Sequence, residues 1–317
     1  MRLRPYLIQK IKAVDFTIFY KYSYDNGKID CGTGYDFFIS AYDGCERTTK
    51  VFDLITAAKK IWIDFPHYHN VAPVEDVYTC KSYKEDECFI ELFEQLDIKF
   101  NSRICIDITG FIRPHLIYLT VYLHRMGIKK IDFLYSEPEH YKNAEDTTFS
   151  GFVSEVKPIE GCSSSINSPR TENDILIISA GYDDKLIARI SNHKSKIKKR
   201  YYILGFPSLQ PDMYQENILK MFQAKDSIGQ RIDRFAPAFD PFVTAQIIND
   251  IVKENPDHSN IYLSPLSTKP QALGIVLYYL WNYETEPVNI VFPYSTTYYP
   301  KTAMGIKKTW KYTLELP

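Results

Sequence analysis

The sequence predicts an α/β protein made of two tandem units, whose mostly parallel sheets are covered by helices. Three observations carry this prediction: short apolar segments recur along the chain, each is followed by a helical pattern, and the two halves show them in the same order. The chain has 317 residues, of which 45% are hydrophobic and 24% are charged. This composition is typical of a globular protein, and the length suffices for two domains.

Eight apolar segments lack a clean alternation of apolar and polar residues. That pattern is typical of strands buried on both faces, as in a parallel sheet covered by helices. The segments span 35–41, 59–65, 103–109 and 129–135 in the first half, and 174–180, 200–206, 260–266 and 288–294 in the second.

Four pairs of segments match between the halves in one order. ISAYDGCER (39–47) matches ISAGYDDK (178–185), and WIDFP (62–66) matches ILGFP (203–207). IDITGFIRP (106–114) matches YLSPLSTKP (262–270), and FLYSEPEHY (133–141) matches FPYSTTYY (292–299). We therefore expect two Rossmann-like units related by internal duplication. The alternative is that strands of doubly wound sheets resemble one another without a duplication.

The same patterns predict the domain organisation. We expect an N-terminal extension with a hairpin over 1–34, a first unit over 35–141, and a connection over 142–172, where Ser, Gly and Pro replace the apolar pattern. The second unit then spans 173–317, with an insertion near 208–250. Helices are predicted at 46–60, 113–127, 184–197 and 269–282, and the prolines at 114 and 270 suit a first helical turn.

Several classes of function are disfavoured by composition. The net charge of −1 predicts no bulk attraction to nucleic acid or to an anionic membrane, and the single dense basic run, HKSKIKKR (193–200), suits a solvated helix end. No window approaches the ~18 consecutive apolar residues of a membrane span. None of the six cysteines is in CxxC spacing, so we expect neither a metal site nor a disulfide framework, and we predict a cytoplasmic protein.

Polar side chains follow the predicted strands, where open α/β sheets bind their ligands. Two predicted helices begin with a cation, Arg113 or Lys269, beside the small or hydroxyl-bearing residues Thr109, Gly110, Ser267 and Thr268. A cation is unfavourable at the positive end of the helix dipole, so this arrangement favours an anion, a phosphate or a carboxylate, bound between the two. The alternative is an ion pair of either cation with Asp107 or Asp240.

Two acidic pairs are candidates for general-base catalysis. Asp43 with Glu46, and Asp183 with Asp184, follow equivalent strands, and two adjacent carboxylates raise one pKa toward neutrality. Each pair has its own cation, Arg47 or Lys185, so a structural ion pair or simple N-capping explains them equally well. His67 and His69 lack a third ligand at readable spacing, so no metal is expected.

The segment IDITGFIRPHL (106–116) resembles the strand–turn–helix of CRISPR-associated Rossmann-fold (CARF) sensor domains, and YLSPLSTKPQALG (262–274) is similar, with Lys269 in place of the cation. The resemblance implies that a cyclic oligoadenylate or related nucleotide binds in a pseudo-twofold or twofold groove. The ligand contacts it implies are Thr109, Gly110, Arg113, Ser267, Thr268 and Lys269. The second turn departs from the pattern because it lacks the glycines.

The whole chain also resembles uncharacterised Rossmann-like proteins found beside prokaryotic defence genes, which implies a component of an antiphage defence system. We therefore expect a protein that recognises a nucleotide or another small phosphate ligand. Arg47 and Lys185 join the expected ligand contacts, and the acidic pairs would bind ribose or base. One alternative is a nucleotide-acting hydrolase or glycosidase that uses one acidic pair as its base. Another is a non-catalytic subunit that binds a partner protein from the same operon.

Overall fold

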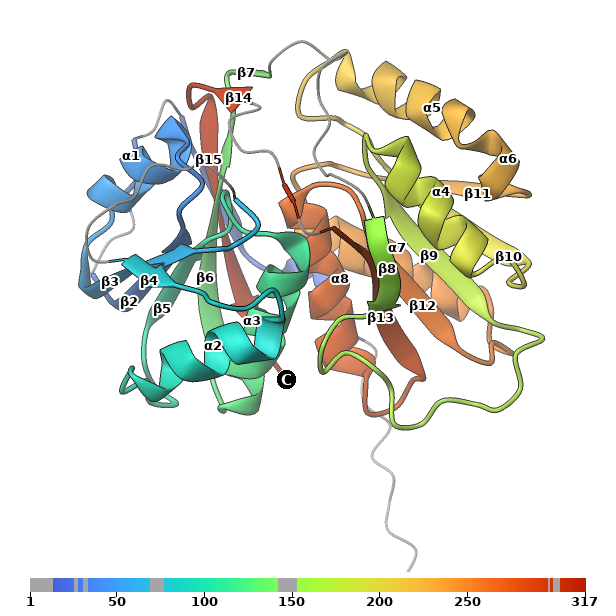
Figure 1. Cartoon of the computed structure of the whole chain (residues 1–317), viewed down its shortest axis with the longest axis horizontal. Coiled ribbons are helices and arrows are strands. Elements are labelled where there is room, and N and C mark those ends of the chain that lie inside the picture. The colour runs from blue at the N-terminus through green and yellow to red at the C-terminus, as the bar shows by residue number, and fades with distance from the viewer. Residues whose placement is uncertain are drawn as a thin grey trace, which may run out of the picture.

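A computed structural model describes residues 14–25, 28–30, 34–68, 77–141, 153–295, 297–298 and 303–317. It is an α/β structure in which two halves, each with a twisted sheet flanked by helices, lie side by side (Figure 1). Both sheets are mostly parallel, as predicted, but each also contains antiparallel pairing, so they are mixed.

The first sheet is built largely from the N-terminal half of the chain. A short 3₁₀ helix, η1 (Phe16–Ile18), precedes its first strand, β1 (Lys21–Asp25). Its remaining N-terminal elements are β2 (Tyr35–Ala41), α1 (Glu46–Leu54), β3 (Ala57–Asp64), β4 (Val77–Thr79), α2 (Glu85–Glu94), β5 (Ile104–Asp107), α3 (Arg113–Arg125) and β6 (Lys130–Glu137).

The C-terminal half supplies the second sheet, the two-stranded β7–β14 ribbon and strand β15 of the first sheet. Two strands, β7 (His140–Tyr141) and β8 (Val153–Pro158), come first. They are followed by β9 (Ile175–Ala180), α4 (Asp184–His193), β10 (Lys199–Gly205), α5 (Met213–Gln223), α6 (Lys225–Ile228), β11 (Ile232–Ala236), α7 (Pro241–Lys253), β12 (Ile261–Pro265), α8 (Lys269–Asn282), β13 (Val288–Ser295), β14 (Ala303–Met304) and β15 (Lys308–Glu315).

The eight predicted strand segments are all strands, namely β2, β3, β5 and β6 in the first sheet and β9, β10, β12 and β13 in the second. The strand orders of the two sheets correspond. The first is β1-β15-β6-β5-β2-β3-β4, and the second, read from its other edge, is β8-β13-β12-β9-β10-β11. Each segment matched in sequence therefore occupies the place of its counterpart.

The two halves exchange one strand each. β8 follows β6 in the chain but pairs antiparallel with β13, whereas β15 follows β13 but pairs antiparallel with β6. In Figure 1 the red β15 thus lies in the left half and the green β8 in the right. The predicted boundaries miss this exchange, because 308–315 lies in the first sheet and 153–158 forms an edge of the second.

Two further boundaries differ from the sequence prediction. β1 pairs with β15 instead of forming a hairpin inside the N-terminal extension, of which 1–13, 26–27 and 31–33 lie outside the described residues. Within the predicted insertion, β11 and α7 occupy the places of β4 and α2, which leaves α5 and α6 as the added helices.

One continuous apolar core spans both sheets, and α3 and α8 contact each other at the centre of the molecule (Figure 1). A disulfide that the spacing did not predict joins Cys80, just after β4, to Cys88 in α2. The other cysteines in the described part of the chain, Cys45, Cys105 and Cys162, are buried thiols. The cysteine pattern therefore gives no support to the predicted cytoplasmic location.

Candidate functional site: a cationic cluster at three helix N-termini

The N-termini of α3 and α8 meet between the two halves. Arg113 is the first residue of α3 and Lys269 is the first residue of α8, and each is followed by a proline. The Nε of Arg113 donates a hydrogen bond to the backbone oxygen of Ser267, at 2.5 Å. The two turns that the sequence singled out are therefore in direct contact, although 154 positions separate them.

A third cation, Arg47, reaches the same place from the first turn of α1. Its side chain is buried, and its Nη1 donates to the backbone oxygen of Ser136 at 2.7 Å. The proximity of the three charges is seen in Lys269. The pKa of this lysine is lowered to about 8, chiefly by burial and to a smaller extent by repulsion from Arg113 and Arg47. We call Arg47, Arg113 and Lys269 the cationic cluster.

The carboxylates near the cationic cluster are both engaged with a helix N-terminus. Asp43 accepts hydrogen bonds from the backbone of Cys45 (3.0 Å) and the hydroxyl of Thr48 (2.8 Å), and it raises the pKa of Lys269 only as a weaker influence than the neighbouring arginines. Asp183 caps α4 by accepting from the backbone of Leu186 at 3.2 Å. Neither α3 nor α8 has an acidic residue in its first turn, where one would favour the helix dipole.

The predicted ion pairs with Asp107 and Asp240 are not formed. Asp107 accepts from Ser40 and Thr109, and Asp240 pairs with Lys21 and caps α7. Over the described ranges, no ion pair and no hydrogen bond joins a carboxylate to Arg113 or to Lys269.

Three tyrosines that the sequence analysis missed lie near Arg113. Tyr298, Tyr68 and Tyr135 interact electrostatically with its guanidinium, as does the carboxylate of Asp183. Burial raises the pKa values of Tyr68 and Tyr298, so their hydroxyls stay protonated at neutral pH and can donate hydrogen bonds. Tyr68 already donates to the backbone oxygen of Gly110 at 2.8 Å. All three lie at or just after the end of a strand. That position is the signal by which the sequence analysis could have included them among the candidate ligand contacts.

Two glycines, Gly110 and Gly181, allow the loops that follow neighbouring strands to approach each other closely. A Cβ on Gly110 would lie 2.2 Å from the backbone oxygen of Ala41, and a Cβ on Gly181 would lie 2.2 Å from the backbone oxygen of Leu266. Gly110 follows β5, whereas Gly181 follows β9. The second half therefore has its glycine on the facing loop, which explains why its β12 turn lacks one.

The predicted hydroxyl contacts have structural partners. The hydroxyl of Thr109 accepts from the backbone of Ser136 at 3.0 Å, and the hydroxyl of Thr268 donates to Ala238 at 2.5 Å and accepts from the backbone of Gln271 at 3.3 Å. Ser267 takes part through its backbone oxygen. These residues shape the two turns.

The remaining predicted site residues lie apart from the cationic cluster or serve the helices. The Glu46 side chain is 54% exposed and pairs with Lys50 one turn later. Asp184 lies 3.8 Å from Lys220, and Lys185 is exposed in the first turn of α4. The structure thus adds Arg47 to Arg113 and Lys269, but it does not bring Lys185 to them.

His67 packs against His115, with ring centroids 5.0 Å apart, and both side chains are buried. Burial and the neighbouring His67 hold the pKa of His115 well below its usual range, so this imidazole is neutral. His69 lies outside the described residues. Among those that are described, no group of three or more His, Cys, Asp or Glu is placed to hold a metal ion.

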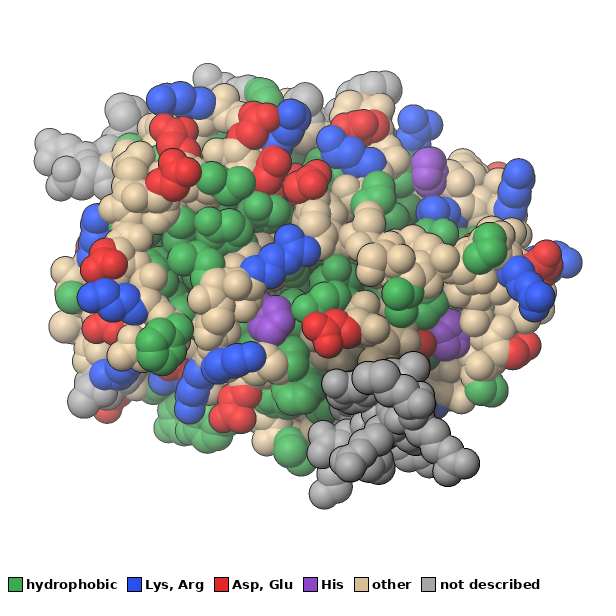
Figure 2. All heavy atoms as spheres, turned by 90° about the horizontal axis from the view of Figure 1, so that it is seen from below, with side chains coloured by type: hydrophobic (Ala, Val, Ile, Leu, Met, Phe, Trp, Pro, Cys, Tyr) green, Lys and Arg blue, Asp and Glu red, His purple; other side chains and the backbone are tan. Residues whose placement is uncertain are grey.

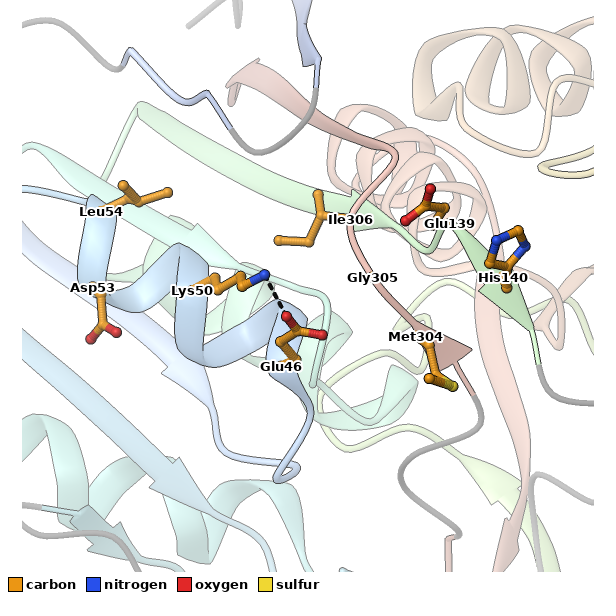
Figure 3. Close-up of a pocket in the computed structure, with 9 residues that line it drawn as sticks. All are labelled: Glu46, Lys50, Asp53, Leu54, Glu139, His140, Met304, Gly305 and Ile306. Carbon is orange, nitrogen blue, oxygen red and sulfur yellow. Dashed lines mark ion pairs between the residues drawn. The ribbon is translucent and has the colours of Figure 1, made fainter.

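A separate pocket of about 690 Å³ lies between α1 and the β7–β14 ribbon. Figure 3 shows Glu46 and Lys50 from α1 on one side and Glu139 and His140 on the other. Glu46 is thus the only predicted catalytic candidate that lines this pocket within the described part of the chain.

Figure 2 shows one face, on whose described part Lys and Arg side chains are interspersed with Asp and Glu, unlike the basic stripe that binds a nucleic-acid backbone. In the described ranges, no helix has the length and apolar character needed to cross a membrane.

No family model, no curated protein and no solved structure matches this chain.

Proposed function

We propose that the chain binds a small anionic ligand, the phosphate group of a nucleotide or a related phosphate compound, at the cationic cluster. The observation that carries the proposal is the convergence of Arg47, Arg113 and Lys269 at three helix N-termini, with no carboxylate paired to Arg113 or Lys269 among the described residues. Like charges at the positive ends of helix dipoles repel one another, and an anion bound among them removes that repulsion.

The correspondence between the halves supports a common origin for the site. We propose that they arose by duplication of one Rossmann-like unit, because the strand orders correspond and each half supplies one outer strand to the other. Arg113 and Lys269 would then be equivalent positions facing each other. We also propose a role in antiphage defence, on the basis of the resemblances to CARF domains and to Rossmann-like proteins found beside prokaryotic defence genes.

Calorimetric titration of the full chain with inorganic phosphate and with nucleoside mono- and triphosphates tests this function. We expect Arg113→Gln and Lys269→Gln each to weaken binding by about tenfold or more, the loss of one charge-assisted contact. Lys81→Gln is the matched control, since the Lys81 side chain is 80% exposed and lies in the first sheet's outer loop. Phosphate binding that survives both site substitutions unchanged would contradict the proposal.

A second candidate function follows from the pocket beside α1. Glu46 and Glu139 both line it with His140, so the pocket offers two carboxyl groups and an imidazole for acid–base chemistry on a nucleotide. A screen for release of base, sugar or phosphate from nucleotides tests it. Turnover that is undiminished in Glu46→Gln and Glu139→Gln would exclude this pocket as the catalytic site.

The third candidate, a non-catalytic subunit that binds a partner protein, predicts no response to nucleotides in either experiment. It also predicts that a second protein co-purifies with the chain from its native host.

A further inference from the structure

Strand β1 is an edge of the seven-stranded sheet, and among the described residues it pairs only with β15. The backbone N–H of Thr313, next to Tyr312 in β15, donates to the oxygen of Tyr20, so the even-numbered positions of β1 bond to β15. Its odd-numbered positions therefore direct their backbone groups away from the sheet. Across the described ranges, no other strand and no side chain bonds to these outward groups of Lys21 or Ser23.

The side chains along this edge include large apolar groups in contact with solvent. Ile18, Tyr20 and Tyr22 are all exposed, and they precede or begin the strand. Tyr22 and Tyr24 lie on the same face of the sheet, with their ring centroids 4.9 Å apart. Exposed apolar side chains beside unpaired backbone groups are typical of an edge that accepts another strand.

We propose that two copies of the chain pair through β1, antiparallel about a twofold axis at Ser23, and so join their first sheets into one. The strand reads KYSYD, which is complementary to itself when reversed. Lys21 then lies opposite Asp25 of the second copy at both ends, and Tyr22 lies opposite Tyr24. Opposite charges and paired aromatic rings are the cross-strand contacts that stabilise a sheet. This proposal does not depend on the anion site.

The backbone supports the same register. Because odd-numbered positions point outward, Ser23 exchanges both of its backbone hydrogen bonds with Ser23 of the second copy, and the N–H of Asp25 donates to the oxygen of the opposite Lys21. The oxygen of Asp25 already accepts from the backbone of Lys28 at 3.1 Å. An axis at Tyr22 or Tyr24 would keep each side chain on its face but would remove both charge pairs.

The internal partners of the two charged residues leave room for these contacts. Lys21 forms an ion pair with Asp240, and its ammonium group has further donors for a second carboxylate. Asp25 lies 3.7 Å from Lys308, and its side chain is 79% exposed. Each residue can therefore add an opposite charge from a second copy without losing its own partner.

The other sheet edges are less suited to such pairing. β4 has only three residues, and β8 ends at Pro158, which has no N–H to donate. β11 paired with itself about its middle residue would place Arg234 against Arg234. The edge at β1 is thus the one whose sequence favours a second copy of the chain.

Sedimentation equilibrium of the full chain, from about 1 to about 100 µM, tests the proposal, and we expect a dimer to predominate at the upper end. Ser23→Pro should weaken association at least about tenfold, because it removes two outward N–H donors per dimer, and it should leave the melting curve unchanged, because that N–H has no partner within the chain.

Asp25→Lys should weaken association similarly, because it places like charges opposite each other at both ends of the paired strands. Asp97→Lys is its matched control, since Asp97 is also exposed and lies 3.3 Å from a lysine, Lys99. The charge reversal also keeps the test decisive if Ser23→Pro does not fold.

Thiol crosslinking tests the register. In chains that carry Cys31→Ser, Tyr22→Cys and Tyr24→Cys are prepared separately and oxidised alone or mixed. The proposed register places positions 22 and 24 of different copies about 4.5 Å apart, within reach of a disulfide, whereas two copies of position 22 are about 7–8 Å apart. We therefore expect a crosslinked dimer in the mixture and little in either variant alone.

Three outcomes overturn the proposal. The first is a chain that stays monomeric up to about 100 µM, whichever other strand this edge then accepts. The second is a dimer that withstands both Ser23→Pro and Asp25→Lys. The third is a mixture of the two cysteine variants that crosslinks no better than either variant alone.

Discussion

Asp107 is a carboxyl group whose ionisation opposes folding. Its side chain is fully buried, at 0% exposure, and its pKa is raised from 3.8 to about 6, chiefly because burial removes it from water. The hydrogen bonds from Thr109 and Ser40 oppose this rise without offsetting the loss of water, and the nearby Asp43 contributes to the rise. We predict that Asp107→Asn stabilises the protein at neutral pH, because it removes the charge and keeps the shape.

The magnitude follows from the pKa difference. The native carboxyl binds a proton more tightly than the unfolded one by about two pKa units, and each unit corresponds to ~1.36 kcal/mol, so ionisation costs the native state about 3 kcal/mol above pH 6. Between pH 4 and pH 6 the native state holds more protons than the unfolded state, and the stability of the wild type falls as the pH rises. The advantage of Asp107→Asn should therefore be small near pH 4 and reach up to about 3 kcal/mol at pH 7.5.

Urea unfolding of both proteins at pH 4.5, 6 and 7.5, followed by tryptophan fluorescence, measures this difference, and scanning calorimetry should show a rise in Tm of about 5 °C at pH 7.5. Asp97→Asn is the matched control, since that side chain is 86% exposed and should not alter the pH profile. If the free-energy difference between wild type and Asp107→Asn does not change from pH 4.5 to pH 7.5, Asp107 does not titrate as burial requires, and the reasoning is refuted.

Three further predictions concern the loops, the cationic cluster and the exchanged strands. Gly110→Ala and Gly181→Ala should each destabilise the protein by about 2 kcal/mol or more in urea unfolding, because each Cβ would lie 2.2 Å from a backbone oxygen; Gly34→Ala, where the nearest atom is 3.2 Å away, should cost less. Phosphate affinity should fall as the pH rises through about 8, where Lys269 loses its charge, and Lys269→Arg should abolish that fall in calorimetry from pH 7 to 9.5. Removal of 306–317 deletes β15 and should abolish cooperative melting in circular dichroism, since β1 loses its partner and β6 loses one of its two partners; a truncated chain that melts within a few degrees of the whole would contradict the role of the exchange.

Local patterns predicted the strands well because the burial of a parallel strand is recorded in its own residues. YDFFISA, predicted over 35–41, is β2 with the same bounds, and the other seven predicted segments differ from their strands by a few residues at the ends. These strands are buried on both faces, so their apolar character is continuous and independent of their partners.

The outer strands could not be assigned in the same way. β8 and β15 are more polar than the inner strands, and which sheet each joins is decided by a partner far away in the sequence. β15 pairs with β6 through residues as distant in the sequence as Lys308 and Glu137. No pattern within either segment indicates that the two strands pair. The sequence analysis did not anticipate this exchange, because it assumed that each unit completes its own sheet.

The turn after β12 lacks the glycine found in the corresponding turn after β5, and this difference shows why the sequence predicted the candidate site only in part. A turn-by-turn comparison counts Gly110 as present in the first half and missing at the β12 turn of the second. The physical requirement belongs to a pair of neighbouring loops, one of which must present a backbone without a Cβ to the other. In the first half the β5 loop meets this requirement against Ala41, and in the second half Gly181 of the β9 loop meets it against Leu266. Since either loop can carry the glycine, its absence from one turn is no argument against two equivalent sites, and the contact between Arg113 and Ser267 forms with one glycine in each half.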